Sequence, residues 1–435
     1  MAENSAVDEV SDEATGRAVD VIKQLGPGLI TGAADDDPSG IATYSQAGAQ
    51  FGPNMLWTVI VCLPMMIAIQ SVAGRIGAVT GKGLAANIKQ VFPRWLLTTL
   101  VVLLVVANTI NIAADVAAMG SAAALVLPGI DFHLYVVAFA VISLLLQVFV
   151  AYHRYVSVLK WLTLALLAYV AVVFTVKIPW GEVGMRLVMP QFAINKDSLT
   201  MIVAILGTTI SPYLFFWQSA QEVEEIEDAD TENKVLRNDP VAARKGLRRI
   251  GIDTISGMVL SEAIAFFVIL TTAVTLNIHH VTNIDSAAKA AEALKPIAGP
   301  FASIIFSLGI IGTGLLAIPV LAGSAAYAVA ETRGWKEGLS HKLLEAKEFY
   351  AIIVLAVLGG VALSFSPIDP IKALVLSAVV NGVVAVPIMA VTMLVAARKD
   401  LMGMCTATSL QRIFGWLATG VMGLAAVAMI VLMLV

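Results

Sequence analysis

The sequence predicts an all-α polytopic membrane protein that crosses the bilayer eleven times. Charged residues make up only 13% of the 435 residues, and the mean hydropathy is +0.87. Apolar runs near the roughly 20 residues needed to cross a bilayer recur along the chain. The sequence shows no nucleotide-binding loop, no nucleophile beside a base and no folded soluble domain, so we predict no enzyme, no cofactor and no nucleic-acid partner.

Residues 1–20 are acidic and polar and lack the apolar core of a signal peptide, which predicts a disordered cytosolic tail. Cys62 and Cys405 fall in or beside apolar runs, which predicts neither a disulfide nor a cysteine metal site. The predicted spans, in order, are 21–51, 54–74, 95–127, 133–152, 156–178, 198–225, 250–276, 300–331, 349–366, 371–397 and 410–434.

The distribution of basic residues predicts the orientation. If the N-terminus is cytosolic and the loops alternate between the two sides, 21 of the 27 Lys and Arg fall on the cytosolic side. Cytosolic loops of membrane proteins carry such an excess, so we expect the C-terminus on the outer side. The six basic residues left for the outer side are Lys177, Arg186, Lys196, Lys289, Lys295 and Lys372.

Two of the predicted spans contain a proline near the middle. Pro38 follows Asp37 in the first span, and Pro212 follows Ser211 in the sixth. Proline removes a backbone donor and disfavours helix in the preceding residue, so we expect helix to give way to extended chain there. Matching breaks five spans apart are typical of inverted-repeat transporters, with repeats over 21–178 and 198–397 and an added helix over 410–434. The simpler alternative is that each proline only kinks a packed helix.

The first break carries the sequence DDDPSG, and its Asp37 is predicted to bind a cation. A carboxylate inside the bilayer costs several kcal/mol unless it faces water or a positive partner, and every Lys and Arg is assigned to a loop or to the end of a span. Thr208 and Ser211 stand three apart before the second break and offer hydroxyl and carbonyl oxygens. Such hard oxygen ligands suit magnesium, calcium or manganese.

These stretches resemble the Nramp divalent-metal transporters. GPGLITGAADDDPSGIATYSQAGAQFG at 26–52 is similar to the first span of that family, whose motif reads Asp-Pro-Gly-Asn before a very similar QAGAQFG. The similarity continues through RIGAVTGKGL at 75–84, GTTISP at 207–212 and GIIGTGLLAIPVLAGSAAYAVAE at 309–331. The resemblance implies a LeuT-type 5+5 inverted repeat with discontinuous helices 1 and 6, and a metal site that these two helices share.

The chain departs from the Nramp pattern at the metal site. Asp37 occupies the position of the family's metal-binding aspartate, but Gly40 replaces its asparagine. The family's Ala-x-x-Met becomes Thr208 to Ser211, so the methionine that favours transition metals is absent. This pattern resembles the Nramp-related magnesium transporters. It implies a wider site, with Asp37, Gly40, Thr208 and Ser211 around a partly hydrated magnesium ion, which manganese would also enter.

A second departure concerns protons. Family members pair an Asp and a Glu of span 3 with a span-6 histidine, whereas this chain has Ala117 at the glutamate position and Tyr213 at the histidine position. Asp115 remains but is displaced by one residue, which turns it by about 100° around a helix. We therefore predict an uncoupled facilitator, driven by a membrane potential worth about 2.3 kcal/mol per charge per 100 mV.

Several polar residues keep two interpretations. Asp35 and Asp36 either line an inner vestibule or form a solvated helix end. Glu262 is either functional or a hydrogen-bonded structural residue. Asn381 is interpreted mainly as a hydrogen-bonding contact between helices, with a role near the site as the alternative.

Two further segments are interpreted as surface features. The acidic residues 221–230 form either a solvated cytosolic loop or a collector of divalent cations, and His279 with His280 is interpreted as an exposed pair on the outer face.

Two other functions stay open: a proton-coupled manganese or transition-metal transporter that uses Asp115 or Glu262, and a membrane metal sensor that does not transport. The expected partners are the metal ion and the bilayer of a bacterial inner membrane. The oligomeric state stays open, with a monomer as the expectation.

Overall fold

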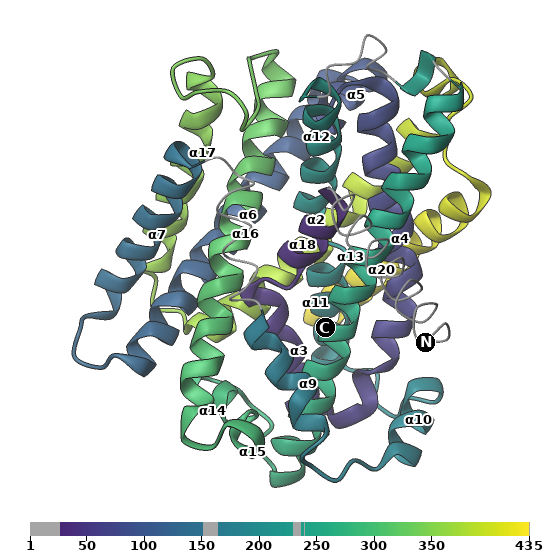
Figure 1. Ribbon diagram of the computed structural model, residues 1–435. Coiled ribbons are helices and arrows are strands. Elements are labelled where there is room, and N and C mark those ends of the chain that lie inside the picture. The colour runs from purple at the N-terminus through teal and green to yellow at the C-terminus, as the bar shows by residue number, and fades with distance from the viewer. Residues whose placement is uncertain (1–26, 151–163, 229–235, 239, 435) are drawn as a thin grey trace, which may run out of the picture.

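The computed structural model describes residues 27–150, 164–228, 236–238 and 240–434, and within these ranges every regular element is a helix. Figure 1 shows the helices as one bundle, with α5 at its upper end and α10, α14 and α15 at its lower end. In chain order the elements are α2 (Pro27–Asp35), α3 (Pro38–Phe51), η1 (Gly52–Met55), α4 (Trp57–Thr80), α5 (Leu84–Val91), α6 (Arg94–Val126), α7 (Phe132–Phe149), η2 (Leu164–Leu166), α9 (Leu167–Val173), α10 (Trp180–Val188), α11 (Lys196–Thr209), α12 (Pro212–Asp228), η3 (Leu236–Asn238), α13 (Pro240–Thr275), η4 (Asn277–His279), α14 (Ala287–Glu292), α15 (Lys295–Ala298), η5 (Gly299–Phe301), α16 (Ala302–Arg333), α17 (Lys347–Ser364), α18 (Pro370–Ala396), α19 (Lys399–Met402) and α20 (Ser409–Leu434).

Most of the predicted spans are confirmed as long apolar helices. Nine segments of the described ranges are long and apolar enough to cross a membrane, and one of them joins α11 and α12. The first predicted span is present as α2 and α3. Much of the fifth lies outside the described residues, which contain only the short apolar helix Leu164–Val173 of that span. The tail 1–20 also lies outside them.

The first predicted break is confirmed. Helix α2 ends at Asp35 and α3 begins at Pro38, and Asp37 between them has an extended backbone with φ −68° and ψ 169°. Proline suits the start of α3, because the first turn of a helix needs no donor from its nitrogen. The polar residues of DDDPSG therefore lie where the helix is interrupted.

The second break follows the same pattern. Helix α11 ends at Thr209, Ile210 leaves the helical conformation with φ −113° and ψ 60°, and α12 begins at Pro212. Ser211 therefore lies between two helices, as predicted.

Glycines bring the broken helices close to their neighbours. A Cβ atom added to Gly32 in α2 would lie 2.4 Å from the backbone of Gly257 in α13. In α11, a Cβ atom on Gly207 would lie 2.1 Å from the carbonyl oxygen of Ala378 in α18. Both half-helices thus pack backbone against backbone, and α3 also packs against α11, α13 and α18. This packing places the two breaks beside each other inside the bundle.

The short helices α5, α10, α14, α15 and α19 were not predicted. Each is only four to nine residues long, so the sequence offers too few turns for a helical period to stand out. They lie in the connections between the long helices, where they leave the arrangement of the predicted spans unchanged.

Candidate metal site

Asp37 is the centre of the candidate site. Its side chain is buried, with 1% of the residue exposed. Its Oδ1 accepts hydrogen bonds from the hydroxyl of Ser39 and from the backbone N–H of Gly40, both at 2.7 Å, so that it caps the N-terminus of α3. The break itself therefore fixes one oxygen of the carboxylate, because two donors of the following turn point at it.

The second oxygen of Asp37 faces two other helices. Nδ2 of Asn111 in α6 donates to Oδ2 at 2.9 Å. The hydroxyl of Tyr213 in α12 lies 3.4 Å from the same oxygen and 3.2 Å from the carbonyl oxygen of Ala34, so its single proton serves two acceptors. Among the described residues, no Lys or Arg forms an ion pair with Asp37. Its negative charge is held by hydrogen-bond donors alone.

Asn111 was missed in the sequence analysis. It is a fully buried amide inside a predicted span, one helical turn before Asp115. Polar side chains inside membrane helices face the bundle interior, which was the available signal. The sequence could not show which residue Asn111 contacts, because its partner lies 74 positions away.

The second wall comes from α11. Oγ1 of Thr208 lies 3.4 Å from Oγ of Ser39, and a Cβ atom added to Gly40 would lie 3.2 Å from the same Oγ1. Asp37, Gly40 and Thr208 therefore meet at the two breaks. The hydroxyl of Ser211 instead lies 2.8 Å from the carbonyl oxygens of both Gly207 and Thr208, at the end of its own helix. In this structure the carbonyl oxygens at the end of α11 are therefore acceptors for the Ser211 hydroxyl.

Asp35 and Asp36 are buried, with 0% and 3% of each residue exposed, so the solvated helix end is the wrong interpretation. Oγ of Ser261 in α13 lies 2.6 Å from Oδ2 of Asp35 and 3.1 Å from Oδ1 of Asp36. The next residue, Glu262, is also buried, and its Oε1 has no hydrogen-bond partner in the described part of the chain. The hydrogen bond expected in its structural interpretation is therefore absent at that oxygen. Three carboxylates cluster on the α2 side of Asp37.

Asp115 and Asn381 are fully buried and lack partners. Both carboxylate oxygens of Asp115, and both polar atoms of the Asn381 side chain, make no hydrogen bond to any described residue. The interhelical hydrogen bond predicted for Asn381 is therefore wrong for the described structure. Asp115 lies one turn from Asn111 on α6 and faces the interior, close enough to Asp37 for their charges to interact, although no described hydrogen bond joins the two.

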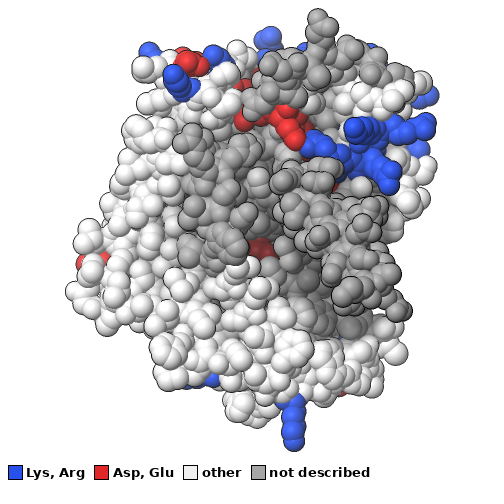
Figure 2. Space-filling view, in the orientation of Figure 1, with Lys and Arg blue, Asp and Glu red and all other residues white. Residues whose placement is uncertain are grey.

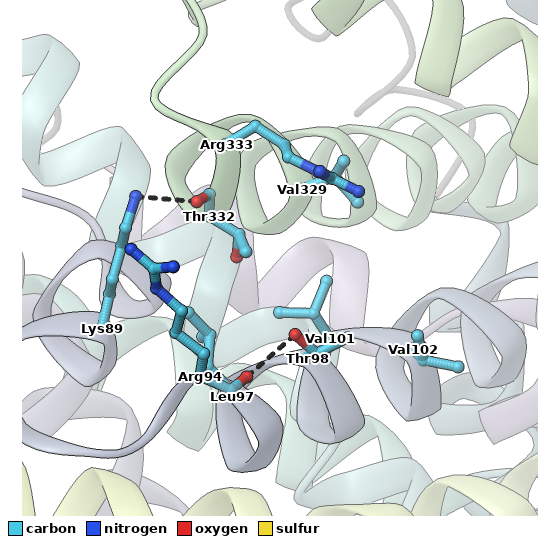
Figure 3. A pocket seen from close by; sticks show the side chains of 9 residues that line it. All are labelled: Lys89, Arg94, Leu97, Thr98, Val101, Val102, Val329, Thr332 and Arg333. Carbon is cyan, nitrogen blue, oxygen red and sulfur yellow. Dashed lines mark hydrogen bonds between the residues drawn. The ribbon is translucent and has the colours of Figure 1, made fainter.

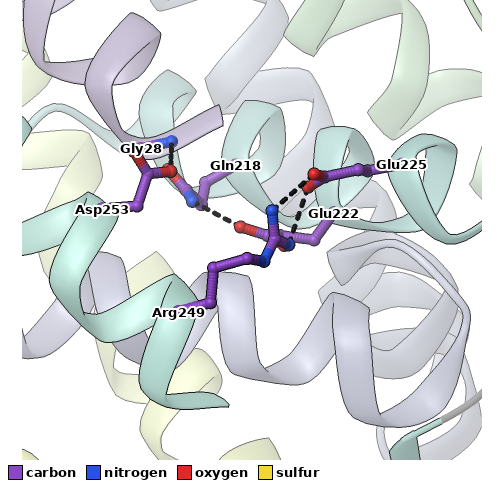
Figure 4. Close-up of polar contacts among 6 residues, drawn as sticks. All are labelled: Gly28, Gln218, Glu222, Glu225, Arg249 and Asp253. Carbon is purple, nitrogen blue, oxygen red and sulfur yellow. Dashed lines mark hydrogen bonds and ion pairs between the residues drawn. The ribbon is translucent and has the colours of Figure 1, made fainter. Parts of the chain in front are cut away.

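Most of the acidic stretch 221–230 is helical, so the solvated loop is wrong for the part up to residue 228; residues 229–230 lie outside the described ranges. Arg249 of α13 forms ion pairs with Glu222 at 3.2 Å and with Glu225, and Nε2 of Gln218 donates to Glu222 at 3.0 Å (Figure 4). The side chain of Glu222 is only 1% exposed, so its charge depends on these partners.

The same polar network holds α2. The backbone N–H of Gly28 donates to Oδ2 of Asp253 at 2.6 Å, and the hydroxyl of Thr31 donates to Oε1 of Gln218 at 2.9 Å (Figure 4 shows the first of these contacts). Gln70 of α4 donates to the same oxygen at 3.2 Å. The first half of the broken helix is therefore tied by side chains to α4, α12 and α13.

The histidine pair and the cysteines lie apart from the helix breaks in sequence. His279 and His280 are exposed, as predicted, and Cys62 and Cys405 are free thiols. Within the described residues, no group of three or more His, Cys, Asp or Glu is arranged to hold a metal ion. A cation at the breaks would thus have one carboxylate and several neutral oxygen atoms around it.

Comparisons with known proteins identify the family of the chain. The family model for "Natural resistance-associated macrophage protein-like" proteins, Nramp, matches residues 28–432. The divalent metal cation transporter MntH of Deinococcus radiodurans is 25% identical over 403 residues, which cover 91% of this chain and 86% of the relative. MntH of Yersinia pestis is 27% identical over 316 residues, 69% of this chain and 73% of the relative.

Solved structures show the same fold. A manganese transporter of Eremococcus coleocola superposes with a TM-score of 0.72 at 16% identity, over 93% of this chain and 85% of the other. Mhp1, a nucleobase-cation-symport-1 family transporter, superposes with a TM-score of 0.57 at 13% identity, over 94% and 92%. The predicted LeuT-type helical bundle is confirmed by these likenesses. Since the family model spans nearly the whole chain, the protein belongs to the Nramp family of integral membrane transporters of divalent metal cations.

Proposed function

We propose that this Nramp protein carries magnesium, and also manganese, across the membrane as partly hydrated ions, by alternating access and without proton coupling. The observation that carries the proposal is the chemistry around Asp37. Besides its own two oxygens, the oxygen atoms of described residues within hydrogen-bond distance of this carboxylate are the hydroxyls of Ser39 and Tyr213. The opposite wall offers the hydroxyl of Thr208 rather than sulfur. A set of hard oxygen atoms with one carboxylate suits magnesium better than soft transition metals.

Partial hydration follows from the short side chains at the breaks. Gly40 has no side chain to offer, and the Ser211 hydroxyl donates to carbonyl groups of its own helix. An ion beside Asp37 would therefore keep water where relatives supply longer ligands. Magnesium dehydrates reluctantly and commonly retains several waters in proteins, which is the behaviour that such a site favours.

The distribution of titratable groups supports uncoupled transport. The described histidines, which are His133, His279, His280 and His341, all lie at helix ends or in connections. Tyr213 stands beside Asp37 and does not titrate near neutral pH in ordinary surroundings. A relay needs a series of protonatable groups within reach of each other. Asp115 lies close enough to Asp37 for their charges to interact, but no described hydrogen bond links the two carboxylates.

The charge distribution supports a cytosolic N-terminus and a bacterial inner membrane. Figure 2 shows the Lys and Arg side chains of this face concentrated toward the upper end, where α5 lies, with few at the lower end. Cytosolic faces carry such an excess. An inside-negative potential would then draw a divalent cation inward.

The division into repeats 21–178 and 198–397 with an added helix 410–434 belongs to the same proposal.

The test is magnesium uptake into proteoliposomes with simultaneous recording of internal pH. Under an imposed negative potential we expect magnesium entry that grows with the potential, with no acidification of the lumen. Liposomes that contain Asp37→Ala protein provide the background. Acidification that tracks metal entry and disappears in Asp115→Asn or Glu262→Gln would instead establish the proton-coupled alternative.

That alternative is a proton-coupled manganese transporter. The buried oxygens of Asp115 and Glu262 that lack partners favour it, as do relatives named as manganese or divalent metal transporters. A metal sensor that does not transport would bind magnesium yet give no flux in the same liposomes.

A further inference from the structure

A cavity lies on the side of the bundle between α5, α6 and α16, far along the chain from the helix breaks. Its volume is about 460 Å³. Figure 3 shows side chains from these three helices around it, with Lys89 and Arg94 toward one end, Val101 and Val102 toward the other, and Arg333 extending beside Val329. The lining residues are Lys89, Arg94, Leu97, Thr98, Val101, Val102, Val329, Thr332 and Arg333.

The basic groups of this cavity have no acidic partner in the described part of the chain. Lys89, Arg94 and Arg333 form no ion pair with any described Asp or Glu. Nζ of Lys89 donates to the carbonyl oxygen of Thr332 at 2.8 Å, which uses one of its three protons (Figure 3). The guanidinium groups of Arg94 and Arg333 make no hydrogen bond to a described residue. Three positive charges therefore line the cavity, and most of their donors have no partner among the described residues.

Neighbouring side chains place the cavity at the edge of the membrane. Arg94 is the first residue of one apolar span and Arg333 is the last residue of another. Trp95, beside Arg94, is 69% exposed, and exposed tryptophans are typical of the level of the lipid headgroups. Val102 lies two turns further along α6 and is 53% exposed, as a residue that contacts acyl chains would be. The cavity is therefore basic at headgroup level and apolar at the level of the lipid chains.

We propose that this cavity binds the phosphate headgroup of an anionic phospholipid. Arg and Lys side chains recognise phosphate oxygens through charge-assisted hydrogen bonds, and basic pockets between membrane helices bind anionic headgroups. The cavity has room for a phosphate and its glycerol, while the acyl chains lie outside along Val101 and Val102. Charge complementarity favours a lipid of net negative charge over a zwitterionic one.

The bound headgroup would join three helices. Lys89 lies on α5, Arg94 on α6 and Arg333 on α16. A protein contact already fastens two of them: Oε2 of Glu331 in α16 accepts from the backbone N–H of Ala86 in α5 at 2.8 Å. Helix α6 already packs against α16 and α5, and the headgroup would add a polar link among the three, so it should stabilise the fold independently of any metal ion.

The test compares a cavity variant with a charge-matched control. The cavity variant carries Lys89→Gln, Arg94→Gln and Arg333→Gln, and the control carries Lys342→Gln, Lys399→Gln and Arg412→Gln, which remove three exposed cations elsewhere. Native mass spectrometry in detergent, with phosphatidylglycerol added and no divalent metal, counts the bound lipids. Thermal unfolding is measured with the same lipid, with phosphatidylcholine and with inorganic phosphate.

We expect the wild-type protein and the control to retain one more phosphatidylglycerol than the cavity variant. Their Tm should rise by about 2 °C or more with this lipid, since a ligand that binds only the folded state stabilises it. An equal rise with phosphatidylcholine would overturn the proposal, and so would an equal rise with inorganic phosphate, which would identify a free-anion site. If the cavity variant does not fold, Arg94→Lys with Arg333→Lys keeps the charge. Loss of the bound lipid in that variant would also contradict a site that depends on charge.

Discussion

Gly40 and Thr208 face each other across the two helix breaks, so closely that a methyl group added to Gly40 would lie 3.2 Å from Oγ1 of Thr208. The two residues are the positions at which the family pattern has asparagine and alanine. A longer side chain at position 40 therefore requires a smaller one at position 208. The small residue at position 40 and the larger residue at position 208 therefore fit each other, and we expect that reversing one substitution requires reversing the other.

Restoring the family residues should change the selectivity of transport. We expect Gly40→Asn alone to impair the uptake of every metal, because the asparagine meets Thr208. Adding Thr208→Ala relieves the contact, and adding Ser211→Met supplies a thioether sulfur, which favours soft ions. In the triple variant, competition assays in proteoliposomes should show tighter cadmium and manganese binding and weaker magnesium uptake.

The matched control replaces methionine by leucine in the same triple variant, which keeps the approximate size and removes the sulfur. This control should not gain cadmium affinity. A folded triple variant with methionine whose magnesium-to-cadmium preference equals that of the wild type would mean that these positions do not line the ion path.

Replacing Asp37 should abolish most transport. Asp37→Asn keeps the shape and removes the only negative charge at the α3 end of the break, so we expect a loss greater than the roughly 10- to 100-fold that supporting residues of metal sites cost. Radiotracer or fluorescence assays of magnesium uptake measure the effect. Asp37→Ala should be at least as severe. Flux at the wild-type level in either variant would contradict the assignment.

Asn111 should position Asp37. In Asn111→Leu the Oδ2 atom of Asp37 retains only the long contact with Tyr213, so the carboxylate becomes less well oriented. We expect the apparent magnesium affinity to fall by about 10-fold, less than in Asp37→Asn, while the maximal rate changes less. The control is Thr109→Val on the same helix, whose hydroxyl donates only to the carbonyl oxygen of Val105. An equal loss in both variants would indicate a general packing effect.

Arg249 should contribute to the stability of the α12–α13 contact. Arg249→Gln leaves Glu222 buried without a positive partner. Breaking a buried ion pair costs about 3–5 kcal/mol, and we expect less here because the Arg249 side chain is 34% exposed. Thermal unfolding in detergent should show a lower Tm. Adding Glu222→Gln should recover part of the loss, whereas a further decrease would mean that the pair is not coupled.

Much of the fold could be predicted because its causes are local. Hydropathy over about 20 residues defines a span, and Pro38 and Pro212 act on the residue before them, so both breaks were predicted from the sequence. The cost of a carboxylate in the bilayer also directed attention to Asp37, whose binding of a cation stays a prediction.

The rest of the site depends on distant residues. Asp35 and Asp36 are buried where α2 packs against α13, and the single hydroxyl of Ser261, more than 220 positions away, lies within hydrogen-bond distance of both carboxylates. The acidic end of α12 is a structured helix because Arg249 of α13 pairs with it. No local pattern contains these contacts, so charge alone could not decide between a vestibule and a solvated helix end for Asp35 and Asp36, or exclude a solvated loop at 221–230.

The four donors around Asp37 also bear on how the protein returns after delivering its ion. In a carrier whose carboxylate lacks hydrogen-bond donors, the conformational change without a bound ion has a high free-energy cost. Such a carrier therefore favours the exchange of one ion for another across the membrane. Here Ser39, Gly40, Asn111 and Tyr213 already satisfy the carboxylate. We therefore expect the empty protein to change its facing without cargo, which would suit the cycle to net uptake rather than to one-for-one exchange.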